Sequence, residues 1–269
     1  SGADLITATA GTSNVRIGVN AGNSIASGGN YNVVVGDEAG TAITTGDHNT
    51  AIGYAALDAE DAGTASVAIG NYALSSQNAD GNNYNTAVGY VAGSNITTGI
   101  QNTLIGALAG DAITDADGNV AVGYAALTTN VLGSDSVAIG KNALNAQNPS
   151  SATAMNNVAV GKNAGEAITT ATHNVAVGFQ AMDATTTGGF NVAIGRDALG
   201  ANTSGTNNTI IGGQSNQLGT AVSHNTMVGY GTGYNTTGSE NTFIGRRSGA
   251  GAGEEVTSGA KNVIIGGYN

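Results

Sequence analysis

The acidic residues are the first candidates for chemistry, because two nearby carboxyl groups can supply the acid and the base of a hydrolase. The tightest acidic group in the sequence is Asp58, Glu60 and Asp61. The other acids are dispersed, and most fall in expected turns. We interpret the group as a solvated turn, and we expect no catalytic residue and no enzymatic activity.

Histidine and aspartate clusters are the next candidates, because both residue types hold metal ions. His48, His173 and His224 each precede an asparagine of the repeat described below, so a threefold arrangement of chains could bring equivalent histidines together. The position also accepts other polar residues. Asp115 and Asp117 have the spacing of a calcium loop but lack its terminal glutamate. We expect no metal site and no cofactor.

Aromatic and amide side chains are the candidates for contact with a receptor. Four tyrosines directly follow a glycine of the repeat and should lie along one edge, where they could stack on glycan rings or pack over the turn. These are Tyr54, Tyr90, Tyr124 and Tyr230. Segments 75–84, 145–156 and 250–261 depart from the repeat length, and loops on a rigid scaffold often carry binding residues. The loop side chains chosen as possible contacts are Gln77, Asn78, Gln147 and Asn148.

A repeat organises the whole chain. Fifteen glycines close a motif of Asn, a β-branched residue, a variable residue and Ile or Val, and nine of the fourteen steps between them are 17 residues. The motif glycines are Gly18, Gly36, Gly53, Gly70, Gly89, Gly106, Gly123, Gly140, Gly161, Gly178, Gly195, Gly212, Gly229, Gly245 and Gly266. A fixed short period in segments rich in Gly, Thr, Asn and β-branched residues, all poor helix formers, predicts a solenoid of stacked coils. We expect one all-β domain over 1–269, a parallel β-roll or β-solenoid of about fifteen 17-residue coils.

Positions within the repeat predict which side chains point inward. The residues one and three before the motif glycine are β-branched and share a face of a short strand, which we assign to the coil interior. The asparagine four before the glycine is replaced only by Ser66 and Ser136, and it should form a ladder of amides from coil to coil.

The residues after the glycine predict a conserved core volume. The third is small, Ala in the first eleven repeats. The fourth and seventh exchange volume: where the fourth is Gly, as at Gly40, the seventh is Ile, as at Ile43. Where the fourth is Leu or Met, as at Leu57, the seventh is polar, as at Glu60. One large aliphatic group per coil is expected from close packing.

The residue between the two β-branched positions should then face outward, yet it is Ala or a larger apolar residue in every repeat except the one with Arg16. An exposed apolar stripe of this length predicts self-association, and parallel copies around a threefold axis would bury it. The interface candidates are Leu104, Ile210, Met227, Phe243 and Ile264.

Composition excludes several classes of function. The formal net charge is −11, with only seven Lys and Arg, so binding of nucleic acid is not expected. The chain has no Cys, which removes disulfides and thiolate metal sites. No apolar run approaches the roughly 20 residues that span a bilayer, so membrane insertion is not expected. The start of the chain does not resemble a signal peptide.

Four segments carry resemblances to known proteins. Residues 49–57 (Asn-Thr-Ala-Ile-Gly-Tyr-Ala-Ala-Leu) and 97–106 (Thr-Thr-Gly-Ile-Gln-Asn-Thr-Leu-Ile-Gly) resemble the repeats of phage tail-fibre proteins. Residues 66–70 and 136–140 (Ser-Val-Ala-Ile-Gly) are more distantly similar to head repeats of YadA-like trimeric autotransporter adhesins, whose repeat is shorter. The resemblance implies a trimeric, left-handed parallel β-roll that attaches to a cell surface.

Together these observations predict a structural and adhesive fibre segment, a tail-fibre-like shaft that presents loops to a host surface. The expected partners are copies of the same chain and a cell-surface glycan or protein receptor, and the expected location is extracellular, on a virion tail fibre or a cell surface. The alternatives are a subunit of a self-assembling extracellular filament that stacks head to tail, and a bacterial surface adhesin. An ice-binding solenoid would need a regular Thr array, and the Thr-Thr-Gly linkers recur too irregularly for it.

Overall fold

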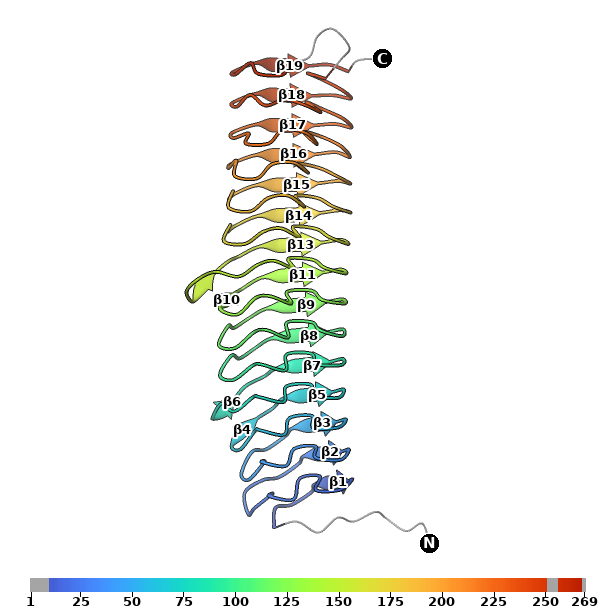
Figure 1. Cartoon of the computed structure of the whole chain (residues 1–269), viewed down its shortest axis with the longest axis vertical. Coiled ribbons are helices and arrows are strands. Elements are labelled where there is room, and N and C mark those ends of the chain that lie inside the picture. Colours follow the sequence, from blue (N-terminus) through green and yellow to red (C-terminus); the bar gives the residue numbers. More distant parts are fainter. Residues whose placement is uncertain (1–9, 251–255, 268–269) are drawn as a thin grey trace. The chain divides into compact units, whose positions relative to one another are not determined.

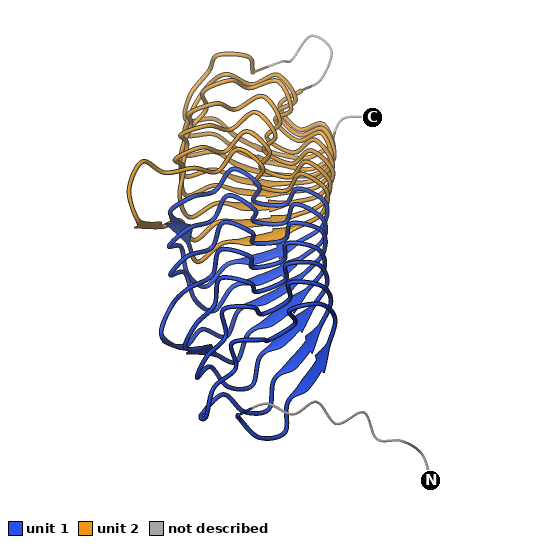
Figure 2. Ribbon diagram, turned by 60° about the horizontal axis from the view of Figure 1, so that its bottom comes forward, with its two compact units in different colours: residues 1–134 blue, residues 135–269 orange. Residues whose placement is uncertain are grey.

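The computed structural model describes residues 10–250 and 256–267, and the described residues form strands, turns and bends without a helix. It follows that this part of the chain contains no helix that could cross a membrane. Two compact units can be distinguished, residues 1–134 and residues 135–269, coloured blue and orange in Figure 2. Each unit is a β-solenoid of stacked coils, as the sequence predicted (Figure 1).

Unit 1 contains seven three-residue motif strands in parallel register. They are β1 (Val15–Ile17), β2 (Val33–Val35), β3 (Thr50–Ile52), β5 (Val67–Ile69), β7 (Thr86–Val88), β8 (Thr103–Ile105) and β9 (Val120–Val122). The short strands outside this stack are β4 (Gly63–Thr64), β6 (Gly81–Asn82) and β10 (Gly133–Ser134), and β4 pairs in parallel with β6. Segment 75–84 therefore contributes a paired strand to the unit as well as a loop.

Unit 2 contains eight motif strands in the same arrangement. They are β11 (Val137–Ile139), β13 (Val158–Val160), β14 (Val175–Val177), β15 (Val192–Ile194), β16 (Thr209–Ile211), β17 (Thr226–Val228), β18 (Thr242–Ile244) and β19 (Val263–Ile265). The short strand β12 (Thr153–Ala154) lies in segment 145–156. Equivalent motif positions pair with each other, as Ala193 does with Ile210, so every motif position forms a column along its unit.

The predicted asparagine ladder is confirmed. In unit 2 the backbone N–H of Asn191 donates to Oδ1 of Asn174 in the preceding coil at 3.0 Å, and its Nδ2 donates to the carbonyl of Gly205 in its own coil at 2.9 Å. Asn102 makes the equivalent bonds in unit 1, to Asn85 Oδ1 and to the carbonyl of Ala116, both 2.8 Å. The ladder therefore joins neighbouring coils and also closes each coil on itself.

The motif glycines are required by two constraints at once. Gly36 has φ +132°, a conformation that side chains rarely adopt. A Cβ built there would lie 2.5 Å from the carbonyl oxygen of Gly53 in the next coil. The close approach of successive turns leaves no space for a side chain at such a glycine, whereas the last motif glycine, Gly266, has open space and only the positive φ, +147°.

The structure reverses the two faces of the motif strand. In β3 the middle residue, Ala51, is fully buried, whereas Thr50 and Ile52 are partly exposed. The same holds along both stacks, except that the middle residues of the end strands β1 and β19 are only partly buried. The prediction that β-branched residues point inward is therefore wrong. They cover the outside of the sheet, and the middle column belongs to the core.

This reversal corrects the predicted oligomer interface. Four of its residues are completely buried inside their own unit: Leu104, Ile210, Met227 and Phe243. The fifth, Ile264, pairs in register with Phe243 in the end strand β19 and is half-buried. Alternation reveals which residues share a face, but with apolar residues on both faces it does not reveal which face is inside.

The predicted exchange of core volume between the fourth and seventh residues after the motif glycine is confirmed. The middle residue of the motif strand also takes part in it. Leu57, Ile43 and their equivalents are fully buried apart from Ile25, which is 7% exposed. A Cβ at Gly110 would lie 2.8 Å from Leu104 Cδ2 and 2.9 Å from Ile113 Cδ1, so the middle strand residue fills the space as well. A large middle residue such as Leu104 accompanies Gly110, while Ala51 accompanies Leu57. This pairing is a sequence signal that could have placed the middle column inside, although Ala87 and Ala159 also accompany a Gly, at Gly93 and Gly165.

Candidate functional site

The four tyrosines chosen from the sequence are exposed, with exposed fractions of 45% for Tyr54, 58% for Tyr90, 52% for Tyr124 and 48% for Tyr230. The first three lie in unit 1, where Tyr54 makes an edge-to-face contact with Tyr72 at 5.3 Å between ring centroids. Tyr230 lies in unit 2 and borders the pocket described below. Exposed rings in equivalent positions can contact a ligand from outside.

Two of the four loop amides cannot contact a receptor. Gln77 and Gln147 are fully buried, whereas Asn78 and Asn148 are exposed. Gln77 Nε2 donates to Ser66 Oγ at 2.8 Å, and Asn85 Nδ2 donates to Gln77 Oε1 at 2.8 Å. The glutamine thus supplies the amide that the ladder lacks where serine replaces asparagine. Gln147 joins the same two positions, but its Oε1 accepts both bonds, from Ser136 Oγ at 3.3 Å and from Asn157 Nδ2 at 2.9 Å.

Glu60 is buried, and the interpretation of its segment as a solvated turn is wrong at this residue. Its carboxylate accepts hydrogen bonds from Gly63 N at 2.7 Å, Gln77 Nε2 at 2.7 Å and Asn83 Nδ2 at 2.9 Å. Burial raises the pKa of Glu60, and these donors act in the opposite direction. Asp61 is exposed. This arrangement links coils through a buried carboxyl group.

Two of the three histidines stack on aromatic neighbours from adjacent coils. His48 lies 5.0 Å from Tyr31 and His173 lies 4.8 Å from Phe190, measured between ring centroids of nearly parallel rings. No group of three His, Cys, Asp or Glu in residues 10–250 and 256–267 is arranged to hold a metal ion. The Asp115 carboxylate accepts hydrogen bonds from Thr97 and Thr98 of the preceding coil, both at 2.8 Å.

Basic residues gather in unit 2. Residues 135–269 contain six basic and seven acidic residues, whereas residues 1–134 contain one basic and eleven acidic. Four of the six directly follow a motif glycine and so share one column: Lys141, Lys162, Arg196 and Arg246. Lys162 Nζ lies 5.6 Å from the ring centroid of Phe179 in the same column. These four residues lie far apart in the sequence, and only their common register in the repeat brings them into one column.

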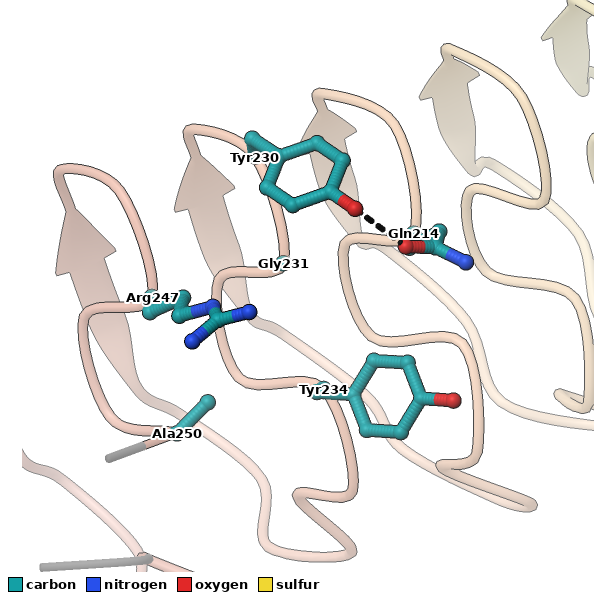
Figure 3. A pocket seen from close by; sticks show the side chains of 6 residues that line it. All are labelled: Gln214, Tyr230, Gly231, Tyr234, Arg247 and Ala250. Atoms are coloured by element: carbon teal, nitrogen blue, oxygen red, sulfur yellow. Dashed lines mark hydrogen bonds between the residues drawn. The ribbon is translucent and has the colours of Figure 1, made fainter. Parts of the chain in front are cut away.

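A pocket of about 310 Å³ opens on unit 2, over three consecutive coils (Figure 3). It is lined by Gln214, Tyr230, Gly231, Tyr234, Arg247 and Ala250. The Tyr230 hydroxyl donates to Gln214 Oε1 at 2.6 Å, which turns the Nε2 of that amide away from the tyrosine. Arg247 carries the only charge among the six lining residues. The pocket therefore combines two phenol rings with a cation and an amide donor.

One lining residue, Gly231, leaves space in this pocket without being required by the fold. The second position after the motif glycine has positive φ in every coil where the structure describes it, and it holds a side chain in all of them except at Gly231. A Cβ at Gly231 would meet only Arg247 Cγ, at 3.5 Å. This position could hold a larger residue, which would fill part of the hollow.

A second hollow of about 330 Å³ lies on the same unit. Its lining residues are Gln180, Asp183, Ala184, Asp197, Gly200, Ala201, Gln217 and Leu218. Burial, followed by the charges of Asp197 and Glu166, raises the pKa of the Asp183 carboxyl group. This hollow is acidic and has no aromatic ring in its lining, so its chemistry differs from that of the Tyr230 pocket.

The outer face of the motif sheet is the other candidate for binding. All residues one and three before a motif glycine are Val, Ile or Thr, so neither column contains a charge. Ile105, Ile139 and Ile194 are 39–40% exposed. Each unit therefore exposes two in-register columns of β-branched side chains, of the kind that a partner surface can bury. We call this surface the β-branched face.

No protein-family model, no curated protein and no solved structure matches this chain.

Proposed function

We propose that this protein is a structural and adhesive fibre segment, a shaft whose copies pack side by side as a homotrimer outside the cell. The shaft presents exposed turns and pockets to a cell-surface glycan or protein receptor. Its action is mechanical and multivalent: several copies of a weak contact on one stiff body add up to firm attachment. This function agrees with the resemblance of residues 49–57 and 97–106 to phage tail-fibre repeats.

The β-branched face is the observation that carries the proposal. Apolar columns such as that of Ile139, Ile194 and Ile211 in unit 2 remain substantially exposed in a single chain, although the same residue types would be stable in a core. Every coil repeats the same side-chain types, so a second copy in parallel register meets equivalent residues at each level. Burial of the columns between copies removes this surface from water and stabilises the assembly.

The coil-to-coil hydrogen bonds support a role as a stiff spacer. Each buried ladder amide bonds to its neighbour, as Asn191 does to Asn174, and buried polar groups that are fully bonded make a structure rigid. A spacer of this kind holds its surface sites at fixed separations. Fixed separations are what multivalent attachment needs, because the sites on one shaft must reach their targets simultaneously.

The experiment is a measurement of solution mass by light scattering after size exclusion, with negative-stain microscopy of the same peak. The natural chain should elute as a species of three chain masses. Replacing Val177 and Ile211, which lie on the β-branched face two strands apart, by Lys should reduce the species to one chain mass. The matched control replaces Thr170 and Ser204, which are exposed and also two coils apart, by Lys and should leave three chain masses.

A single chain mass for the natural protein would contradict the proposal. So would an unchanged mass for the Val177→Lys and Ile211→Lys variant, because the face would then take no part in assembly. Long filaments in the microscope would favour the alternative of a subunit that stacks head to tail.

A further inference from the structure

We propose that the pocket formed by Tyr230, Tyr234, Arg247 and Gln214 binds a carboxylate-bearing sugar residue of a surface glycan. This inference rests on the proposed adhesive function and names the class of receptor that one site of the shaft would recognise.

The charge and hydrogen-bonding groups of the pocket favour an anion with acceptor atoms. Arg247 presents a planar guanidinium that can bond both oxygens of a carboxylate. The Tyr230 hydroxyl donates to Gln214 Oε1, which leaves the phenol oxygen able to accept a bond and places the Gln214 Nε2 donors on the side of the amide away from Tyr230 (Figure 3). An amide and phenol groups are suited to the hydroxyls of a sugar.

The aromatic rings favour a ligand with an apolar face. Tyr230 and Tyr234 are 48% and 36% exposed, and both come from the coil that follows β17. The C–H face of a pyranose ring can cover such a surface while its hydroxyls remain bonded to water or protein. The volume, about 310 Å³, is at the small end of ligand pockets, which suits one sugar residue of a longer chain.

The surroundings reinforce the preference for an acidic ligand. Arg246 adjoins Arg247 and belongs to the basic column of unit 2, whereas most of the protein's acidic excess lies in residues 1–134. The hollow itself includes Gly231, at a position where the other coils that the structure describes carry a side chain. The site thus unites a cation, two rings and an amide around space that the fold does not require.

The test measures binding of two matched probes to the full chain by saturation-transfer NMR and calorimetry. Methyl glucuronide and methyl glucoside differ in the carboxylate alone, and acetate supplies a carboxylate without a sugar ring. The glucuronide should bind, with saturation transferred to its ring protons. The glucoside should bind with an affinity that is lower by a factor of roughly ten or more, because a charge-assisted hydrogen-bond pair is lost. Acetate should bind no better than the glucoside.

Three variants locate the binding. Arg247→Gln should reduce glucuronide affinity to that of the glucoside, whereas the neighbouring control Arg246→Gln should retain it. Gly231→Gln places in the hollow a residue that already adopts the same conformation at Gln180 and Gln214, with φ 53° and 56°, so it should fold and abolish binding of both sugars.

Equal affinity for glucuronide and glucoside, equal effects of the two arginine variants, or no binding of either sugar would overturn the inference. Light scattering of each variant separates this result from the proposed assembly. A trimer that binds neither sugar contradicts the ligand assignment alone. A monomer that binds the glucuronide contradicts the assembly alone.

Discussion

Gln77 donates a hydrogen bond of 2.8 Å from Nε2 to the hydroxyl of Ser66, in a coil where serine replaces the ladder asparagine. The same nitrogen donates to Glu60 Oε2 at 2.7 Å, and Gln77 Oε1 accepts from Asn85 Nδ2 at 2.8 Å. One buried side chain thus reconnects three coils at the point where the ladder is interrupted. A residue chosen from the sequence as a surface contact proves to be part of the core.

Replacing Gln77 by Leu should lower the free energy of unfolding by about 2 kcal/mol, because it leaves buried polar partners without their hydrogen bonds at nearly constant volume. Urea denaturation followed by circular dichroism measures the change. The adjacent exposed residue supplies the control, and Asn78→Ala should change stability by less than about 0.5 kcal/mol. Equal effects of the two substitutions would show that the bridge contributes nothing.

Glu60 should make stability depend on pH in a definite direction. Burial raises its pKa above the ordinary value of 4.5, so the folded chain holds this proton more tightly than the unfolded chain. Below the ordinary value both states are protonated and the contribution to stability is complete. As the pH rises through the raised pKa, the unfolded chain loses its proton first and the contribution is lost.

The Glu60→Gln variant lacks this titration. The difference in melting temperature between the natural chain and the variant should therefore favour the natural chain most at about pH 4 and decline towards about pH 7. Asp58 and Asp183, whose pKa values burial also raises, titrate in both proteins and cancel from the difference. A difference that stays constant over this range is the result that rules out the raised pKa.

Truncation of two neighbouring residues of β8 should destabilise the fold to very different extents. Leu104 is fully buried and Ile105 is 40% exposed. Leu104→Ala should cost about 3 kcal/mol, because it leaves a cavity beside Gly93 and Gly110. Ile105→Ala should cost no more than about 1 kcal/mol in an unassembled chain. Thermal unfolding of both variants tests the assignment of faces, and a larger loss for Ile105 would reverse it.

The exchange of core volume predicts strong coupling between substitutions in one coil. Gly110→Leu alone should cost about 3 kcal/mol, because its side chain would meet Leu104 and Ile113. Adding Leu104→Ala and Ile113→Asn recreates the combination found at Ala121, Leu127 and Asn130, and should recover most of the loss. Denaturation of the single, double and triple variants measures the coupling, and simple additivity would refute the volume exchange.

The sequence alone determined the architecture of this protein. A 17-residue period with Gly, Asn and β-branched residues in fixed places allows few structures other than stacked coils. The Asn174 to Asn191 ladder and the burial of Leu57, Ile43 and their equivalents up to Leu199 were predictable for the same reason: Asn recurs at the ladder position, and a large aliphatic residue recurs at one of two core positions. Repetition makes such a signal strong, since every coil reports the same environment.

Tertiary structure decided which strand face is buried, which polar side chains bond to each other and where the pocket forms. Ala51 and its equivalents could be assigned to the interior only from the core space that they face. Leu57 fills that space in one coil, whereas Gly40 leaves it open to other side chains in another. Alternation along a strand carries no information about that space. Gln77 and Glu60 look like surface residues in the sequence, and only coil-to-coil distances show that they bond to each other. The Tyr230 pocket likewise depends on residues 16 and 17 positions apart, brought together because each coil returns to the same place one strand spacing away.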